Sequence, residues 1–85
     1  MRPTQIRENQ MLTNEGRINY QKIVGFKAKQ TANGWYRIYA KVINEKGNLS
    51  VHEVCETTAE AFLMTWKGVR SMATMLTDDD YYVEI

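Results

Sequence analysis

The chain has 85 residues, 44% of them hydrophobic and 25% charged, and a formal net charge of +1 at pH 7. A chain of this size buries about 60–65% of its unfolded surface, which is enough for one core and excludes two separate domains. The net charge close to zero argues against a dedicated binder of polyanions.

The amino-terminal segment, residues 1–15, is polar and is expected to form a tail or an edge strand. Ile18 and Tyr20 then alternate with polar residues, which indicates a strand. The alternation changes phase at Gln21-Lys22. We therefore predict one long strand from about Arg17 to Lys29 that contains a β-bulge at this dipeptide.

Two alternating runs, Ile23–Lys29 and Trp35–Ile43, flank an Asn33-Gly34 dipeptide, which is the strongest short-range signal for a β-hairpin. A two-residue loop would mix apolar and charged side chains on both faces, because a shift of one residue moves every side chain to the opposite face. A three-residue loop, Ala32-Asn33-Gly34, with Gly34 in the left-handed region, places the apolar side chains on one face and the charged side chains on the other. Its core face is expected to hold Val24, Phe26, Ala28, Ile38, Ala40 and Val42, with Tyr36 at the edge.

A turn at Asn44–Gly47 is predicted to lead into a third strand over about Asn48–Cys55. A four-residue loop would place Leu49 and Val51 on the core face, opposite apolar residues of the second strand. The third strand would then complete the sheet surface that a helix covers.

The tetrapeptide Thr57-Thr58-Ala59-Glu60 matches a capping box, in which a threonine hydroxyl accepts from a backbone amide and the glutamate reaches back. A helix from about Thr58 to Leu76 is predicted to follow. Its apolar stripe is expected to comprise Phe62, Trp66, Val69, Ala73 and Leu76, widened by Met64, Met72 and Met75, with Lys67 and Arg70 facing outward. Three aspartates end the helix, and Tyr81, Val83 and Ile85 alternate as a last strand.

These elements predict an α+β fold over residues 16–85. We expect an antiparallel sheet of four to five strands in the order (β)βββαβ, with one helix packed on one face. A single helix covers a single face, so the other face is exposed to solvent or used for binding.

The uncovered face of the central hairpin alternates basic and aromatic side chains. Its candidate binding residues are Lys27, Lys29, Trp35, Arg37, Tyr39 and Lys41. Rings stack on nucleobases and cations neutralise phosphates, so this pattern is typical of a surface that binds single-stranded nucleic acid. Lys29 opposite Arg37 is destabilising unless an anion lies between them. The alternative is an ordinary charged sheet exterior on which residues 1–12 cover the two rings.

Charge is unevenly distributed along the chain. Residues 1–50 hold nine of the eleven Lys and Arg residues, whereas residues 51–85 hold seven of the ten Asp and Glu residues. A second candidate surface is an acidic patch formed by Asp78, Asp79, Asp80 and Glu84. It would contact a basic partner rather than a metal ion, because consecutive aspartates point in divergent directions and no alternating ligand loop follows.

His52 and Cys55 suggest a thiol–imidazole pair. Residues three apart on a strand point to opposite faces, so the pair requires a bulge, which is plausible at His52-Glu53. No phosphate-binding glycine loop, zinc spacing or serine elbow is present, and no cofactor or metal is predicted.

The cellular setting follows from three sequence features. A single cysteine excludes an internal disulfide and favours a reducing compartment. No export signal and no membrane span are recognised in the sequence. A cytoplasmic location is therefore expected.

In size and layout the chain resembles the small accessory and inhibitor proteins that phages and mobile elements encode. The uneven charge, the exposed aromatic residues and the lack of a catalytic set favour a non-catalytic inhibitor or adaptor of nucleic-acid-handling machinery, which would dock on a protein through the exposed sheet face or the acidic terminus. Direct binding of single-stranded nucleic acid is the alternative, and a small enzyme that uses Cys55 is a remote third hypothesis. Short edge strands and a methionine-rich helix flank also allow a homodimer.

Overall fold

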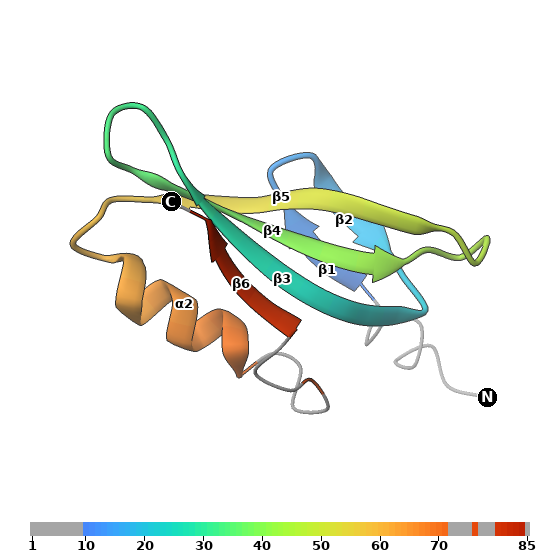
Figure 1. Ribbon diagram of the computed structural model, residues 1–85. Coiled ribbons are helices and arrows are strands. Elements are labelled where there is room, and N and C mark those ends of the chain that lie inside the picture. Colours follow the sequence, from blue (N-terminus) through green and yellow to red (C-terminus); the bar gives the residue numbers. More distant parts are fainter. Residues whose placement is uncertain (1–9, 72–75, 77–79, 85) are drawn as a thin grey trace.

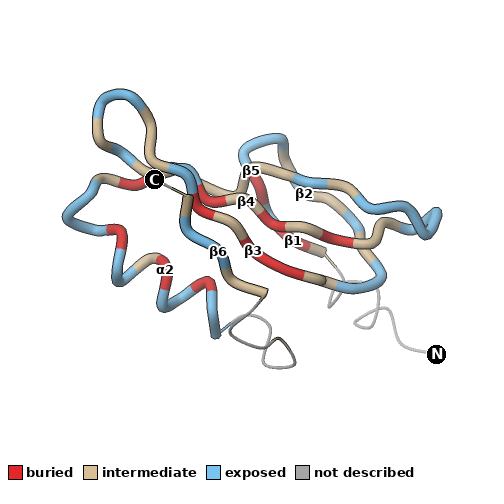
Figure 2. Tube along the Cα trace, in the orientation of Figure 1, coloured by how far each residue is buried: buried red, intermediate tan, exposed pale blue. Residues whose placement is uncertain are grey.

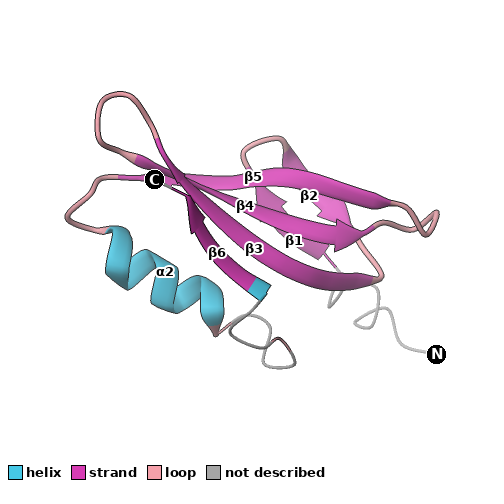
Figure 3. Cartoon of the chain, in the orientation of Figure 1, coloured by secondary structure: helices cyan, strands magenta, loops and turns pink. Residues whose placement is uncertain are grey.

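The computed structural model describes residues 10–71, 76 and 80–84 of the chain. The fold is α+β, as the sequence predicts, with one helix among the described residues (Figures 1 and 3). The elements in chain order are β1 (Gln10–Thr13), β2 (Gly16–Asn19), β3 (Lys22–Gln30), β4 (Tyr36–Ile43), β5 (Leu49–Thr57), α2 (Phe62–Arg70) and β6 (Tyr81–Glu84).

The strands form a four-stranded sheet in the order β5-β4-β3-β6 and a two-stranded sheet of β1 and β2. The prediction of a purely antiparallel sheet is wrong, because β6 runs parallel to β3. Strand β5 already runs parallel to β3, since each is antiparallel to β4. The connection through α2 then leads into β6, which runs in the same direction as β5, because a crossover connection joins parallel strands.

The β3–β4 hairpin has the predicted three-residue loop. Thr31 N donates to Trp35 O at 2.6 Å, and Gly34 N donates to Thr31 O at 3.0 Å. Gly34 has φ 88°, which only glycine adopts without strain. The predicted pairs of Phe26 with Ala40 and Lys29 with Arg37 are confirmed.

The bulge of β3 lies further along the chain than predicted. Ile23 pairs with Val42 and Gly25 pairs with Lys41, so Val24 is the extra residue. The prediction of a bulge at Gln21-Lys22 is wrong, because the chain leaves its strand conformation at Tyr20 and Gln21. The predicted long strand is therefore split into β2, which pairs with β1, and β3.

The β4–β5 register differs by one residue from the prediction. Asn44 N donates to Asn48 O at 2.9 Å, which leaves a three-residue loop that ends with Gly47 at φ 85°. Leu49 therefore pairs with Ile43 and Val51 with Lys41, on the face opposite the core. The cause is local, because Asn44 Oδ1 accepts hydrogen bonds from two backbone amides of this loop.

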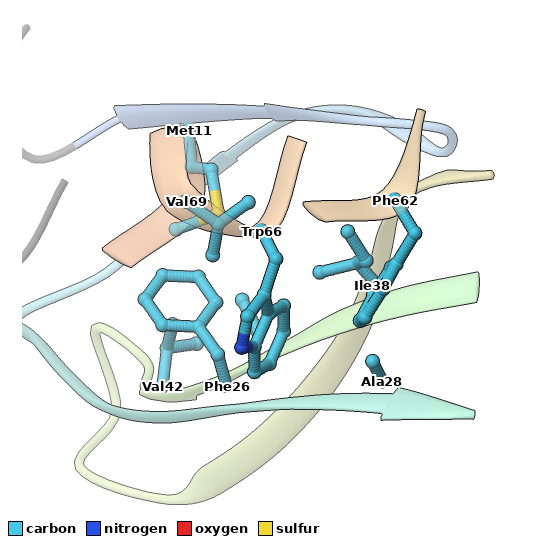
Figure 4. Close-up of a cluster of buried hydrophobic side chains, with 9 residues drawn as sticks. Met11, Phe26, Ala28, Ile38, Val42, Phe62, Trp66 and Val69 are labelled. Atoms are coloured by element: carbon cyan, nitrogen blue, oxygen red, sulfur yellow. The ribbon is translucent and has the colours of Figure 1, made fainter. Parts of the chain in front are cut away.

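The core lies between the sheet and two covering elements. Phe26, Ala28, Ile38, Ala40 and Val42 have no exposed surface, and Figure 2 shows the buried stretches of β3 and β4 in red. They form one cluster with the buried residues of α2. Figure 4 shows Met11 of β1 and Val69 of α2 in the same cluster. The aromatic members stack, with ring centroids 4.1 Å apart for Tyr36 and Phe62 and 5.8 Å apart for Phe26 and Tyr81.

Helix α2 confirms part of the predicted stripe. Phe62, Trp66 and Val69 are buried, and Leu76 packs partly against the core. The helix begins four residues later than predicted, because the Thr58 hydroxyl accepts from Ala61 N within a preceding turn. Met64 does not widen the stripe, since it is 82% exposed. The remaining predicted stripe residues Met72, Ala73 and Met75, together with Ile85 of the last strand, lie outside the described residues.

Candidate functional site

The sheet brings the six predicted binding residues onto one surface. Lys27 and Lys29 of β3 pair with Tyr39 and Arg37 of β4, and Lys41 follows Tyr39 in the same alternation. Trp35 immediately precedes β4, two residues before Arg37, and its carbonyl oxygen accepts from Thr31 N. Their sequence neighbours on both strands belong to the buried core, so these side chains point away from α2. We call this side of the four-stranded sheet the outer face.

The two flanking strands add residues that the sequence prediction missed. Glu56 of β5 pairs with Arg37, and Glu84 of β6 pairs with Lys29. One step along the strands, Glu53 pairs with Tyr39, and Tyr82 of β6 pairs with Lys27. Because side chains alternate along a strand, the predicted inward positions of Tyr81 and Val83 already place Tyr82 and Glu84 on the opposite face. The sequence does not show that this strand lies beside β3.

Across the sheet, the charged row reads Glu56, Arg37, Lys29, Glu84. Arg37 Nε lies 3.5 Å from Glu56 Oε2. Glu84 Oε1 lies 3.9 Å from Lys27 Nζ, which also sits 5.6 Å from the centroid of the Tyr39 ring. Among the described residues, no ion pair within 4.0 Å holds Lys29. Within the described residues, the predicted like-charge pair therefore consists of Arg37, which has a carboxylate within 4.0 Å, and Lys29, which has none.

Arg37 is tightly held in its charged form. Its pKa is raised above the ordinary value, first by a hydrogen bond with the Tyr39 side chain and then by the charges of Glu53 and Glu56. The guanidinium therefore has neighbours of favourable charge on β4 and β5. Its planar set of N–H donors is well suited to bind an oxygen anion.

A hollow of about 340 Å³ lies at the hairpin end of the outer face. Lys29 and Arg37 line it together with Thr31, Tyr39 and the residues Gln30 and Ala32. The loop beside it is ordered by the Thr31 hydroxyl, which interacts with Asn33 Oδ1 and with Trp35 O. Cationic, hydroxyl and aromatic groups therefore converge on one concavity.

Apolar side chains occupy other parts of the same face. Leu49 and Val51 of β5 are 62% and 49% exposed, although they were predicted to be buried. Tyr82 is 56% exposed and Trp35, at the end of the hairpin, is 41% exposed. The outer face is therefore a mixed surface of ion pairs, aromatic rings and aliphatic groups.

The alternative in which residues 1–12 cover the rings of this face is not supported by the part of that segment that the structure describes. Met11 is buried in the core cluster, on the side that α2 covers. The turn after β1 reaches the edge of β5 instead, where Asn14 N donates to Glu53 O at 3.0 Å. Residues 1–9 lie outside the described part of the chain.

His52 and Cys55 do lie on the same side of the sheet, because Val54 forms a bulge in β5. The surroundings of the two side chains do not favour an activated thiol, however. His52 Nδ1 donates to Glu15 Oε1 at 3.0 Å, and its Nε2 forms a hydrogen bond of 2.8 Å with the Ser50 hydroxyl. Burial and the charge of Glu53 raise the pKa of Cys55, whereas a nucleophilic thiol needs a lowered pKa.

The predicted acidic patch is only partly described. Asp78 and Asp79 lie outside the described residues, and Asp80 immediately precedes β6. Glu84 lies on the outer face beside the lysines of β3. In the described part of the chain, no three His, Cys, Asp or Glu side chains gather where they could hold a metal ion.

Comparisons of the chain with protein-family models, with curated proteins and with solved structures found no match. Within residues 10–71, 76 and 80–84, no helix is both long enough and apolar enough to cross a membrane.

Proposed function

We propose that this protein is a non-catalytic binding module that docks on a protein partner through the outer face of its sheet. An inhibitor or an adaptor acts in this way. The observation that carries the proposal is the composition of this face. Exposed tyrosine, tryptophan, leucine and valine side chains share this face with Arg37, which pairs with Glu56. Aromatic residues and arginine dominate the energetics of protein interfaces.

The charges of the face favour a protein over a nucleic acid as the partner. Each end of the charged row is a glutamate, Glu56 on β5 and Glu84 on β6. A phosphate backbone that crosses the sheet along this row would meet a carboxylate at either edge, and repulsion there would weaken binding. A protein surface can match such an alternating pattern with charges of its own.

The test is affinity capture from extracts of the cells in which the protein is made, with three immobilised full-length proteins. The first is the wild type, and the second carries Leu49→Thr with Val51→Thr, which removes apolar surface and places a β-branched strand former at both positions. The third carries Leu63→Gln with Met64→Gln, which removes the exposed apolar side chains of α2 instead. We expect one protein to be retained by the wild type and by the helix variant, and at least about tenfold less by the sheet variant.

Equal retention by both double variants would contradict docking through the outer face. Circular dichroism of each variant serves as the folding control, because all four substituted side chains are exposed. Release of the captured protein by nuclease treatment would indicate a nucleic-acid bridge and would also contradict the proposal.

A second candidate function is direct binding of single-stranded nucleic acid. It is favoured by one observation, the Lys29–Arg37 pair beside Tyr39 and the exposed Trp35. Fluorescence anisotropy with labelled oligonucleotides over a salt series tests it. Micromolar binding that weakens steeply with salt and is lost in Trp35→Ala is the expected result for this candidate, and no binding at low salt eliminates it.

A further inference from the structure

We propose that the hollow beside the β3–β4 loop binds a side-chain carboxylate of the partner, so that the protein recognises an acidic, extended peptide segment. This inference rests on the proposed function and specifies the partner chemistry of the same face. The hollow is the one lined by Lys29, Thr31, Arg37 and Tyr39.

The first argument is the pairing of two cations at this position. Lys29 and Arg37 stand directly opposite each other on adjacent strands, where like charges are destabilising. Arg37 is compensated through Nε by Glu56, while no described carboxylate lies within 4.0 Å of the Lys29 amine. An anion placed between the two side chains would remove their repulsion and form charge-assisted hydrogen bonds with both.

The second argument is the number of anions that the site can hold. Glu56 and Glu84 close the row on both sides, so the positive potential is confined to the middle two strands. One oxygen anion fits between these flanks, whereas the next charge of a polyanion in line with the row would face a glutamate. A single aspartate or glutamate of a peptide satisfies this geometry better than a chain of phosphates does.

The third argument is the kind of group next to the hollow. Trp35 pairs with Thr31 at the rim through the backbone, and 41% of its surface is exposed. A peptide that places its carboxylate in the hollow can lay a neighbouring apolar side chain on this ring. We therefore expect a carboxylate followed or preceded by a large apolar residue, in a segment without regular helical structure.

The experiment is an NMR titration of the ¹⁵N-labelled full chain with a short capped peptide that contains one glutamate next to a leucine. The control peptide carries glutamine in place of glutamate. We expect shifts confined to the amides of Lys29–Ala32 and Arg37–Tyr39 with the acidic peptide, and none with the control. Binding should weaken as salt is added, because the contact is an exposed ion pair.

Three variants locate the site. Lys29→Gln and Arg37→Gln should each reduce the affinity at least about fivefold. Lys46→Gln removes the same charge from an exposed loop at the far end of the sheet and should change the affinity by less than about twofold. Equal losses in all three variants would show a general charge effect and would overturn the inference, as would equal shifts with both peptides.

A second titration uses an eight-nucleotide oligothymidylate. Weaker binding than that of the acidic peptide at the hollow supports recognition of a carboxylate. Binding at least tenfold tighter than the peptide, with the same amides shifted, would assign the hollow to phosphate and overturn the inference. If the hollow binds no carboxylate but capture still depends on Leu49 and Val51, the inference fails while docking through the outer face stands.

Discussion

The substitutions Gly25→Ala and Gly68→Ala should change the free energy of unfolding in opposite directions, because of the two glycines only Gly25 lies close to another segment of the chain. A Cβ at Gly25 would lie 3.0 Å from the carbonyl oxygen of Asp80 and 3.7 Å from Lys41 Cδ. A Cβ at Gly68 of α2 would meet nothing within 4 Å. Neither glycine has a positive φ, so backbone strain does not enter the comparison.

The expected magnitudes follow from these distances. Gly68→Ala should stabilise the protein by about 0.5–1 kcal/mol, since alanine is the better helix former. At Gly25 the neighbour is backbone rather than a flexible side chain, and overpacking costs about 1–3 kcal/mol. A gain of about 0.4–1 kcal/mol from the stiffer unfolded chain offsets part of this cost. Gly25→Ala should therefore destabilise the protein by up to about 2.6 kcal/mol.

Thermal unfolding followed by circular dichroism measures both changes. For a domain of this size about 1 kcal/mol corresponds to a Tm shift of about 4–8 °C, so the two variants should bracket the wild type. Amide hydrogen exchange should be faster in β6 of the Gly25→Ala protein, because the displaced Asp80 carbonyl leads into that strand. A Tm for Gly25→Ala equal to or above that of the wild type would refute the close approach of Asp80 to β3.

Three further outcomes are expected. Phe26→Ala should lower the free energy of unfolding in urea by about 3–5 kcal/mol, because the ring is fully buried and stacks on Tyr81; a loss below about 1 kcal/mol would contradict its place in the core. Iodoacetamide should modify Cys55 more slowly in the native protein than in the unfolded one, because the pKa of its thiol is raised in the native state. The stability that this shift contributes is present below the ordinary thiol pKa and is lost as the pH rises through the higher native pKa. This loss of stability should be absent in Cys55→Ala. A double-mutant cycle of Glu15→Gln and His52→Gln should give a coupling free energy below about 1 kcal/mol, because Glu15 is exposed to solvent. Amide hydrogen exchange in these variants should be faster in β1 and β2 and unchanged in α2.

The β3–β4 hairpin was predictable because two independent signals agree on it. The loop chemistry places a glycine where φ is positive, and the same loop length separates apolar from charged side chains on both strands. The positions of Lys29, Arg37 and Tyr39 on one face follow from that register alone. The part of the candidate site that β3 and β4 supply could therefore be predicted from sequence.

The β4–β5 hairpin was not predictable in the same way, because its signals disagree. Burial of Leu49 and Val51 favours a four-residue loop, whereas Gly47 at φ 85° closes a three-residue loop. The structure has the three-residue loop, so Ser50 and His52 occupy the positions of β5 that lie on the core side of the sheet. These polar side chains are satisfied by each other and by Glu15, a residue 37 positions away that no local pattern connects to them.

The bulge at Val54 then determines what the outer face contains. Without an extra residue, the pairing of Tyr39 with Glu53 would continue so that Cys55 opposed Arg37 and Glu56 turned toward the core. With Val54 as the extra residue, Cys55 turns inward against the core and Glu56 comes to lie beside Arg37. The adjacent apolar residues Val54 and Cys55 are the sequence trace of this shift, because they interrupt the alternation. One inserted residue therefore adds the Glu56 carboxylate beside Arg37, on a face that already carries Glu53 and Glu84, and this added carboxylate is a physical ground for expecting a protein rather than a nucleic acid there.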